Sequence, residues 1–194
     1  VRRPPRSTLD RSSAASDVYK RQVVVLLQNL FRNLGKKKYM NEKAKYYIQK
    51  LQLKKHPEGG YYREIYRAAE SFFIEQPKKA IRRNVSTSIY FLLDGSQVSK
   101  FHRLRSDEQW HFYDGASVNI YIIDEKGKLK EIVLGKKSEQ GEVFQAVILK
   151  NCWFAAEVNN KRSFSLIGCT VSPGFDFSDF ELADRATLTI QYPK

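Results

Sequence analysis

The sequence is poor in cysteine and contains no long hydrophobic run. Its two cysteines, Cys152 and Cys169, lie within apolar, strand-like runs and not at the loop spacings of a disulfide framework or a zinc site. We therefore expect both thiols to be reduced core residues. The longest apolar run, residues 23–27, is far shorter than the roughly 20 residues that cross a bilayer. This length predicts no membrane span and a cytoplasmic protein.

Acidic residues are also scarce, but only at one end of the chain. The formal net charge is +13, and residues 1–39 carry ten Lys and Arg against two Asp. The remaining 155 residues therefore have a net charge of only +5. The basic clusters at residues 36–38 and 54–55 are more typical of solvated faces than of nucleic-acid sites. We expect neither a nucleic-acid partner nor a membrane partner.

The first 39 residues do not look like part of the domain. Residues 12–22 (SSAASDVYKRQ) resemble a translated sequencing adapter, and the only methionine of the chain is Met40. A transit peptide is the alternative, because the segment is rich in Arg and poor in acids. Under either interpretation, residues 1–39 are expected to be a non-native or disordered leader and residues 40–190 a single domain.

Hydrophobic periodicity changes once along this domain. Apolar residues recur at spacings of three and four over residues 41–53, with Asn41 placed as an N-cap, which predicts one short helix. Short β-branched and aromatic runs follow, without a long helical insert, which favours an antiparallel sandwich or barrel over a βαβ fold. The expected strands are near residues 61–67, 85–93, 97–104, 108–113, 118–124, 129–134, 143–150, 152–158 and 163–172.

The most informative segment for chemistry runs from Phe101 to Gly115. His102 and Leu104 share one face of a strand, and Glu108, Trp110 and Phe112 form a second alternating row after a turn. An imidazole and a carboxyl group are thus expected to converge in a pocket walled by aromatic rings. The partner of Glu108 is expected to be either His102 or a bound ligand, because an unpaired buried carboxylate is costly.

This segment resembles the first motif of the cupin superfamily, in which two histidines one residue apart precede a Glu and a turn glycine. His102, Glu108 and Gly115 match the motif, whereas Leu104 stands where the second histidine is usual. In the second motif, Asn151 takes the turn and Phe154 lies near the position of the last ligand. Because two of four ligands are missing, we expect no metal and no other cofactor.

Three further segments, HPEGGYYREIYR (residues 56–67), TSIYFLL (87–93) and GCTVSPGFDFSDFEL (168–182), resemble an uncharacterised, epimerase-like branch called cupin five. The resemblance implies an all-β fold, a cupin jelly-roll (double-stranded β-helix) barrel with a short N-terminal helix, and a homodimer. Residues 175–185 are expected to cover one end of the barrel with a short turn of helix.

Candidate site residues follow from this resemblance and from strand alternation. Tyr62, Glu64 and Tyr66 are expected on one face of the first strand, with Arg63 and Arg67 on the other. His111 falls opposite Glu108 unless a bulge returns it to the pocket. The candidate catalytic residues are His102, Glu108, His111 and Tyr62, and the candidate ligand-binding residues are Trp110, Phe112, Tyr66, Tyr90 and Trp153.

Three functions remain open on this basis. The first is a metal-independent sugar epimerase or isomerase that uses His102 and Glu108 for proton transfer. The second is a non-catalytic module that binds a sugar-like ligand or an organic acid in the same pocket. The third is a metal-dependent cupin with an incomplete ligand set, because one barrel type hosts many unrelated reactions.

Overall fold

The computed structural model describes residues 40–75 and 80–191. The expected leader, residues 1–39, lies outside the described residues. One helix opens the domain, α2 (Glu42–Lys50), and its N-cap is Asn41, whose side chain accepts hydrogen bonds from the backbone N–H groups of Lys43 and Ala44. This confirms the predicted cap, which satisfies two of the N–H groups that a helix leaves without partners at its start.

Thirteen strands follow within the described residues, paired in antiparallel ladders. They are β1 (Lys54–Lys55), β2 (Tyr61–Arg67), β3 (Ser71–Ile74), β4 (Ile81–Asn84), β5 (Thr87–Asp94), β6 (Val98–Arg103), β7 (Asp107–Gly115), β8 (Val118–Ile123), β9 (Leu129–Leu134), β10 (Gln145–Ile148), β11 (Trp153–Val158), β12 (Phe164–Ser172) and β13 (Glu181–Leu182). The short helical segments are η1 (Ser138–Gln140), η2 (Phe177–Asp179) and α3 (Arg185–Gln191).

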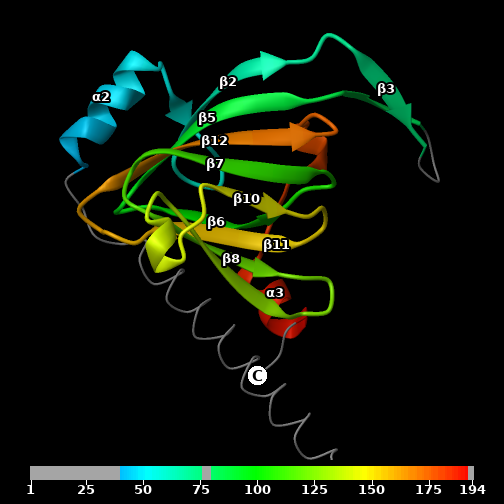
Figure 1. Ribbon diagram of the computed structural model, residues 1–194. Helices are drawn as coiled ribbons and strands as arrows, with labels where there is room; N and C mark the ends of the chain where they lie inside the picture. Colours follow the sequence, from blue (N-terminus) through cyan, green and yellow to red (C-terminus); the bar gives the residue numbers. More distant parts are fainter. Residues whose placement is uncertain (1–39, 76–79, 192–194) are drawn as a thin grey trace, which may run out of the picture.

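The strands form two large sheets and one separate hairpin. The six-stranded sheet has the order β1-β2-β5-β12-β7-β10, and the five-stranded sheet has the order β13-β6-β11-β8-β9. Strands β3 and β4 pair only with each other and extend away from the barrel (Figure 1). The nine expected strands correspond to β2 and β5–β12, whereas the β3–β4 hairpin and the two-residue strands β1 and β13 were not predicted.

The core lies between the two sheets. Phe91, Trp110 and Ile167 from the six-stranded sheet pack in one buried cluster with Ile120 and Phe154 from the five-stranded sheet. Helix α2 covers one end of the outer face of the six-stranded sheet, and α3 lies against the outer face of the five-stranded sheet (Figure 1). The all-β jelly-roll barrel with a short N-terminal helix is thereby confirmed.

Both cysteines are free and buried, as expected from their apolar surroundings. The helices of the described residues are all too short or too polar to cross a membrane. Asn151 has a positive φ of 64°, which places it in the turn where the second cupin motif predicts one.

Candidate functional site

A cavity of about 390 Å³ lies at one end of the barrel. Strands β2, β5, β6, β7 and β12, the turn before β2 and the segment after β12 contribute its walls. The lining residues are Lys54, His56, Glu58, Tyr62, Glu64, Arg67, Thr87, Ile89, Phe91, His102, Leu104, Glu108, Cys169, Val171, Phe175, Asp176, Phe177 and Phe180. The structure thus brings three of the predicted catalytic residues, Tyr62, His102 and Glu108, to one cavity.

The buried carboxyl group of Glu58 is the centre of the polar contacts in this cavity. Its Oε2 lies 3.2 Å from His56 Nδ1 and 3.1 Å from His102 Nε2. Its Oε1 accepts a hydrogen bond of 2.8 Å from the Ser99 hydroxyl. The partner of His102 is therefore Glu58 and not Glu108, which is a correction to the pairing considered from the sequence.

Two glycines place Glu58 beside β6. Gly59 and Gly60 have φ values of 119° and 73°, which residues with a Cβ rarely adopt. A Cβ atom on Gly59 would lie 2.2 Å from the carbonyl oxygen of Val98, so only glycine allows the turn to approach β6 this closely. The backbone N–H of Lys100 then donates to the Glu58 carbonyl oxygen at 2.9 Å.

His102 and Glu58 share one proton. His102 Nδ1 lies 2.6 Å from the carbonyl oxygen of Lys100, which only accepts, so Nδ1 carries a hydrogen. A hydrogen bond between Nε2 and Oε2 then needs one more proton, on either atom. The pair has no net charge in both cases.

The pKa values of these two groups reflect their burial and their mutual contact. Burial alone would raise the pKa of Glu58, but the charge of His102 and the hydrogen bonds from His56 and Ser99 outweigh it and hold this pKa below its ordinary value. Burial lowers the pKa of His102, against the opposing effects of Glu58 and the Lys100 carbonyl. Protein contacts occupy both ring nitrogens of His102, which leaves it no nitrogen for a ligand.

Glu108 lies on the opposite side of the barrel interior, on β7. Burial and, to a smaller extent, the nearby charge of Glu58 raise the pKa of its carboxyl group to about 8, against hydrogen bonds from Trp110 and Cys169 that lower it. Its Oε2 is buried and has no hydrogen-bond partner among the described residues. At neutral pH this side chain is therefore a carboxylic acid, and its Oε2 can form a further hydrogen bond.

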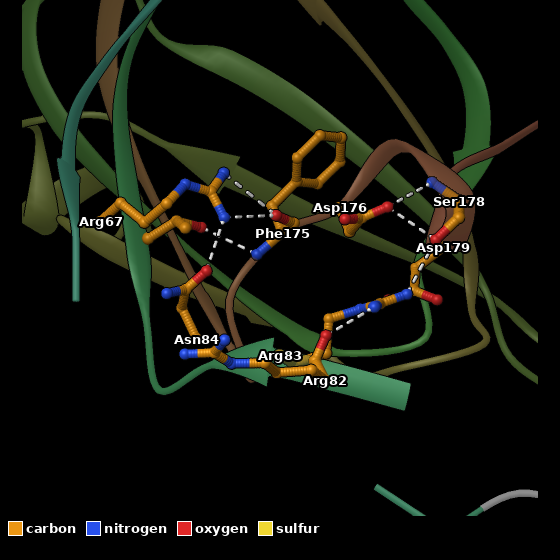
Figure 2. A network of polar contacts seen from close by, with 9 residues as sticks. Arg67, Arg82, Arg83, Asn84, Phe175, Asp176, Ser178 and Asp179 are labelled. Atoms are coloured by element: carbon orange, nitrogen blue, oxygen red, sulfur yellow. Dashed lines mark hydrogen bonds and ion pairs between the residues drawn. The ribbon is translucent and has the colours of Figure 1, made fainter. Parts of the chain in front are cut away.

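An aromatic segment, residues 175–180, covers the cavity from the β12 end and contains the expected short helix, η2. Figure 2 shows how two arginines hold it: Arg67 donates to the Phe175 carbonyl oxygen from both terminal nitrogens at 3.2 Å, and Arg83 pairs with Asp179 at 2.6 Å. Phe177 stacks on the His56 ring, with centroids 6.2 Å apart. The segment thus forms a ring-lined wall of the cavity.

Arg67 reaches this position through a bulge in β2. The pairing with β5 shifts between Glu64 and Tyr66, so Ile65 is an extra residue in the ladder. Beyond it, Arg67 lines the cavity, whereas Tyr66 is 54% exposed and does not. The strict alternation expected for Tyr66 and Arg67 is therefore wrong at these two residues.

The other predicted site residues lie away from the cavity lining. Trp110 is buried in the main core with Phe112 packed against it, and Trp153 belongs to the cluster beneath α3. Tyr90 packs against Tyr113 and the cluster beneath α2. His111 lies 3.4 Å from the Thr170 hydroxyl, and the register shift of β7 at Tyr113 comes too late to turn it inward.

Sequence reasoning missed His56, Glu58, Arg67 and the rings of the 175–180 segment as site residues. The HPEGG segment contains an imidazole and a carboxyl group next to paired glycines, and this combination was a usable signal. Its glycines indicated a turn, but the turn's neighbour in space is β6, about 40 residues further along the chain.

The donor set does not fit the metal that the histidine-rich cupin motif holds. Leu104 lines the cavity in place of a histidine, and the Phe154 ring packs on His102 with centroids 4.0 Å apart. Within residues 40–75 and 80–191, no three His, Cys, Asp or Glu side chains form a group suited to a metal ion.

Comparisons with known proteins agree with this fold. The chain is 32% identical over 143 residues to the uncharacterized protein YML079W of Saccharomyces cerevisiae, covering 68% of this chain and 71% of the yeast protein. The crystal structure of protein SO0799 from Shewanella oneidensis matches with 42% identity and a TM-score of 0.70, covering 80% of this chain and 92% of that one. A hypothetical protein from Leishmania major matches with 35% identity and a TM-score of 0.70, covering 77% and 92%.

The family described as "Cupin superfamily (DUF985)" matches residues 45–183, which include every strand of the two large sheets that lines the cavity. The chain belongs to this family of the cupin superfamily.

Proposed function

We propose that the cavity is the active site of an acid–base enzyme of the epimerase or isomerase type, which moves a proton on a carbon next to a carbonyl group. One observation carries the proposal: a protonated carboxyl group, Glu108, whose Oε2 has no partner among the described residues, lines the same cavity as a histidine oriented by a buried carboxyl group. Such a reaction needs one group that accepts a proton and another that donates one.

His56 is the proposed base. His56 Nδ1 lies 3.2 Å from Glu58 Oε2 and 3.5 Å from the Glu58 backbone N–H, and because the shorter contact is to an acceptor we assign the hydrogen to Nδ1, which fixes the ring and its tautomer. No described residue bonds to its Nε2. A carboxylate behind an imidazole stabilises the positive charge that develops when Nε2 takes a proton. His102 supports this arrangement through Glu58 as a positioning residue, and Tyr62 packs edge-on against the His56 ring at 4.6 Å.

Glu108 is the proposed acid. A carboxylic acid donates a hydrogen bond to a carbonyl oxygen and stabilises the negative charge that forms there when the neighbouring carbon loses its proton. The pKa of about 8 keeps the proton on Glu108 at neutral pH and still permits its transfer. Glu108 thus keeps its expected role in proton transfer, whereas the role of the base is assigned to His56 in place of His102.

The test is incorporation of deuterium from D₂O next to a carbonyl group. Dihydroxyacetone, fructose and their phosphates are incubated with the protein, and loss of the C–H signal is followed by NMR. We expect exchange above the uncatalysed rate for at least one compound, and a loss of about 10²–10⁴-fold in Glu108→Gln and in His56→Asn. Asn keeps an N–H group for Glu58 while removing the base.

The control is Gln109→Ala, which alters the exposed neighbour of Glu108 and is expected to leave exchange unchanged. If none of the compounds exchanges above background, the proposal of an enzyme is rejected. Tight ligand binding that survives Glu108→Gln would then favour the non-catalytic binding module.

We also propose that the chain forms a homodimer. Strand β10 is the last strand of the six-stranded sheet, and its outward side chain Val147 is 49% exposed, beside exposed Phe144 and Leu149. An apolar sheet edge of this kind is commonly covered by a second copy.

A further inference from the structure

Three of the ionisable groups deep in the cavity, His102, Glu58 and Glu108, together carry no net charge. His102 and Glu58 share one proton and are neutral as a pair. Glu108 is a neutral acid at neutral pH, because burial raises its pKa to about 8. A charged ligand placed among these groups would have no counter-charge to compensate for the water it loses.

Among the described residues, Arg67 is the only one that brings a guanidinium group to the cavity lining, and its donors are already used. Its Nε and Nη2 donate to the two carboxylate oxygens of Glu64 at 3.0 and 2.7 Å. Its Nη1 donates to Asn84 Oδ1 at 3.0 Å, and Nη1 and Nη2 both donate to the Phe175 carbonyl oxygen. These bonds account for all five N–H groups, so Arg67 is a clamp for the 175–180 segment and not an anchor for an anion (Figure 2).

Two opposite charges remain among the lining residues. Lys54 lies over the Tyr62 ring, 5.1 Å from its centroid, and Asp176 accepts hydrogen bonds from Ser178. Most of the apolar lining consists of aromatic rings, from Tyr62, Phe91, Phe175, Phe177 and Phe180, with Ile89, Leu104 and Val171 beside them. Such walls favour the C–H faces of a small ring-shaped or branched ligand.

We infer that the natural ligand of this cavity is a small carbonyl compound without net charge, whose oxygen accepts a hydrogen bond from Glu108. This inference rests on the proposed function and narrows its substrate class. It excludes carboxylates and phosphate esters, because the one guanidinium group in reach is saturated and the interior has no positive charge in excess.

Three compounds with the same six-membered carbon ring test whether the charge of a ligand decides its affinity: cyclohexanone, cyclohexanecarboxylate and cyclohexylammonium. Each is titrated into the ¹⁵N-labelled 194-residue chain at pH 7, and the amide signals of Glu108, Cys169 and Phe177 are followed. We expect cyclohexanone to bind at least tenfold more tightly than either ion. Equal or tighter binding of an ion, or no response of these amides to cyclohexanone, would overturn the inference.

Two variants of Glu108 test the hydrogen bond. Glu108→Gln keeps a donor and is expected to bind cyclohexanone within about threefold of the unaltered chain. Glu108→Leu removes the donor and is expected to weaken binding at least tenfold, while its amide spectrum shows that it folds. Equal affinity in the two variants would contradict a hydrogen bond from this side chain.

Deuterium exchange separates the inference from the proposed function. Cyclohexanone that binds, with no exchange of its α-hydrogens or of those of the sugars and sugar phosphates tested above, would refute the acid–base reaction and leave the ligand class standing. Exchange in levulinate, an anionic ketone, but not in cyclohexanone would refute the ligand class and leave the reaction standing.

Discussion

At the scale of the residue, the cavity depends on how each buried polar atom is satisfied. Glu58 receives contacts from His56, His102 and Ser99, so its carboxyl group is fully satisfied without solvent. Glu108 instead keeps one oxygen for which the described part of the chain offers no partner. A buried polar group with no partner lowers the stability of the folded chain, and such groups are typical of ligand-binding sites.

A comparison of two fully buried serines, Ser99 and Ser165, measures how much the hydrogen bond to Glu58 contributes to stability. Ser99→Ala removes a hydroxyl that donates to Glu58 at 2.8 Å, and we expect it to lower the free energy of unfolding by about 1–3 kcal/mol. Ser165→Ala removes a hydroxyl that has no partner, and we expect a change near zero or a small gain. Urea denaturation of both variants is the measurement, and equal losses would contradict the role of the Ser99 hydrogen bond.

The raised pKa of Glu108 predicts a pH-dependent stability. Its pKa rises from 4.5 to about 8 on folding, so between these values the folded chain keeps a proton that the unfolded chain releases. Its contribution to stability is therefore complete below about pH 4.5 and is lost as the pH rises to about 8, by up to about 1.4 kcal/mol per pH unit.

Glu108→Gln has no titrating group at this position, so the difference in unfolding free energy between the two chains is expected to change across this range. Denaturant titrations at four pH values measure it, with Glu139→Gln, an exposed position in η1, as the control. A difference that does not vary with pH would contradict the raised pKa.

At the scale of the element, the bulge in β2 decides which side chains enter the cavity. Tyr62 and Glu64 lie before the extra residue Ile65 and line the cavity as alternation predicts. After it, Arg67 turns inward and reaches the 175–180 segment. One inserted residue thus links the first long strand to the segment that covers the barrel.

Loss of this link is expected to loosen the covering segment. Arg67→Ala removes the hydrogen bonds to the Phe175 carbonyl, and we expect amide hydrogens of residues 175–180 to exchange about tenfold faster or more. Arg63→Ala, on the same strand but outside the cavity lining, is the matched control. Mass-spectrometric exchange that is equal in the two variants would show that Arg67 does not hold the segment.

At the scale of the whole molecule, two antiparallel sheets enclose the main core and the cavity between them. Helices α2 and α3 each cover part of an outer face (Figure 1), and among the described residues β10 is the last strand of its sheet, with Val147 exposed. This edge belongs to the same sheet as Glu108. Assembly through it would leave the cavity, at the β2 side of that sheet, open to ligand.

The proposed homodimer predicts a solution mass near twice the 22.6 kDa of one chain. Val147→Glu places a charge on the exposed edge and is expected to shift sedimentation equilibrium towards the monomer. Ile190→Glu, at an apolar and even more exposed position on α3, is the control and is expected to leave the mass unchanged. A monomer in the unaltered chain, or a dimer that tolerates Val147→Glu, would count against this interface.

The sequence by itself determined the class of fold. Local periodicity and turn residues predicted α2 with its Asn41 cap and the nine strands of the barrel, because these features depend on neighbours within a few positions. Alternation also placed His102 and Glu108 in one interior. The β3–β4 hairpin was not predicted, because its arginine-rich second strand has no alternating apolar pattern.

Only the tertiary structure decided the chemistry of the site. Glu58 and Ser99 are 41 positions apart, and their contact exists because a glycine turn packs against β6. The bulge at Ile65 reversed the faces of Tyr66 and Arg67, and β5 sets that register from outside the strand. Contacts between distant segments depend on how whole elements pack, and no local pattern records them.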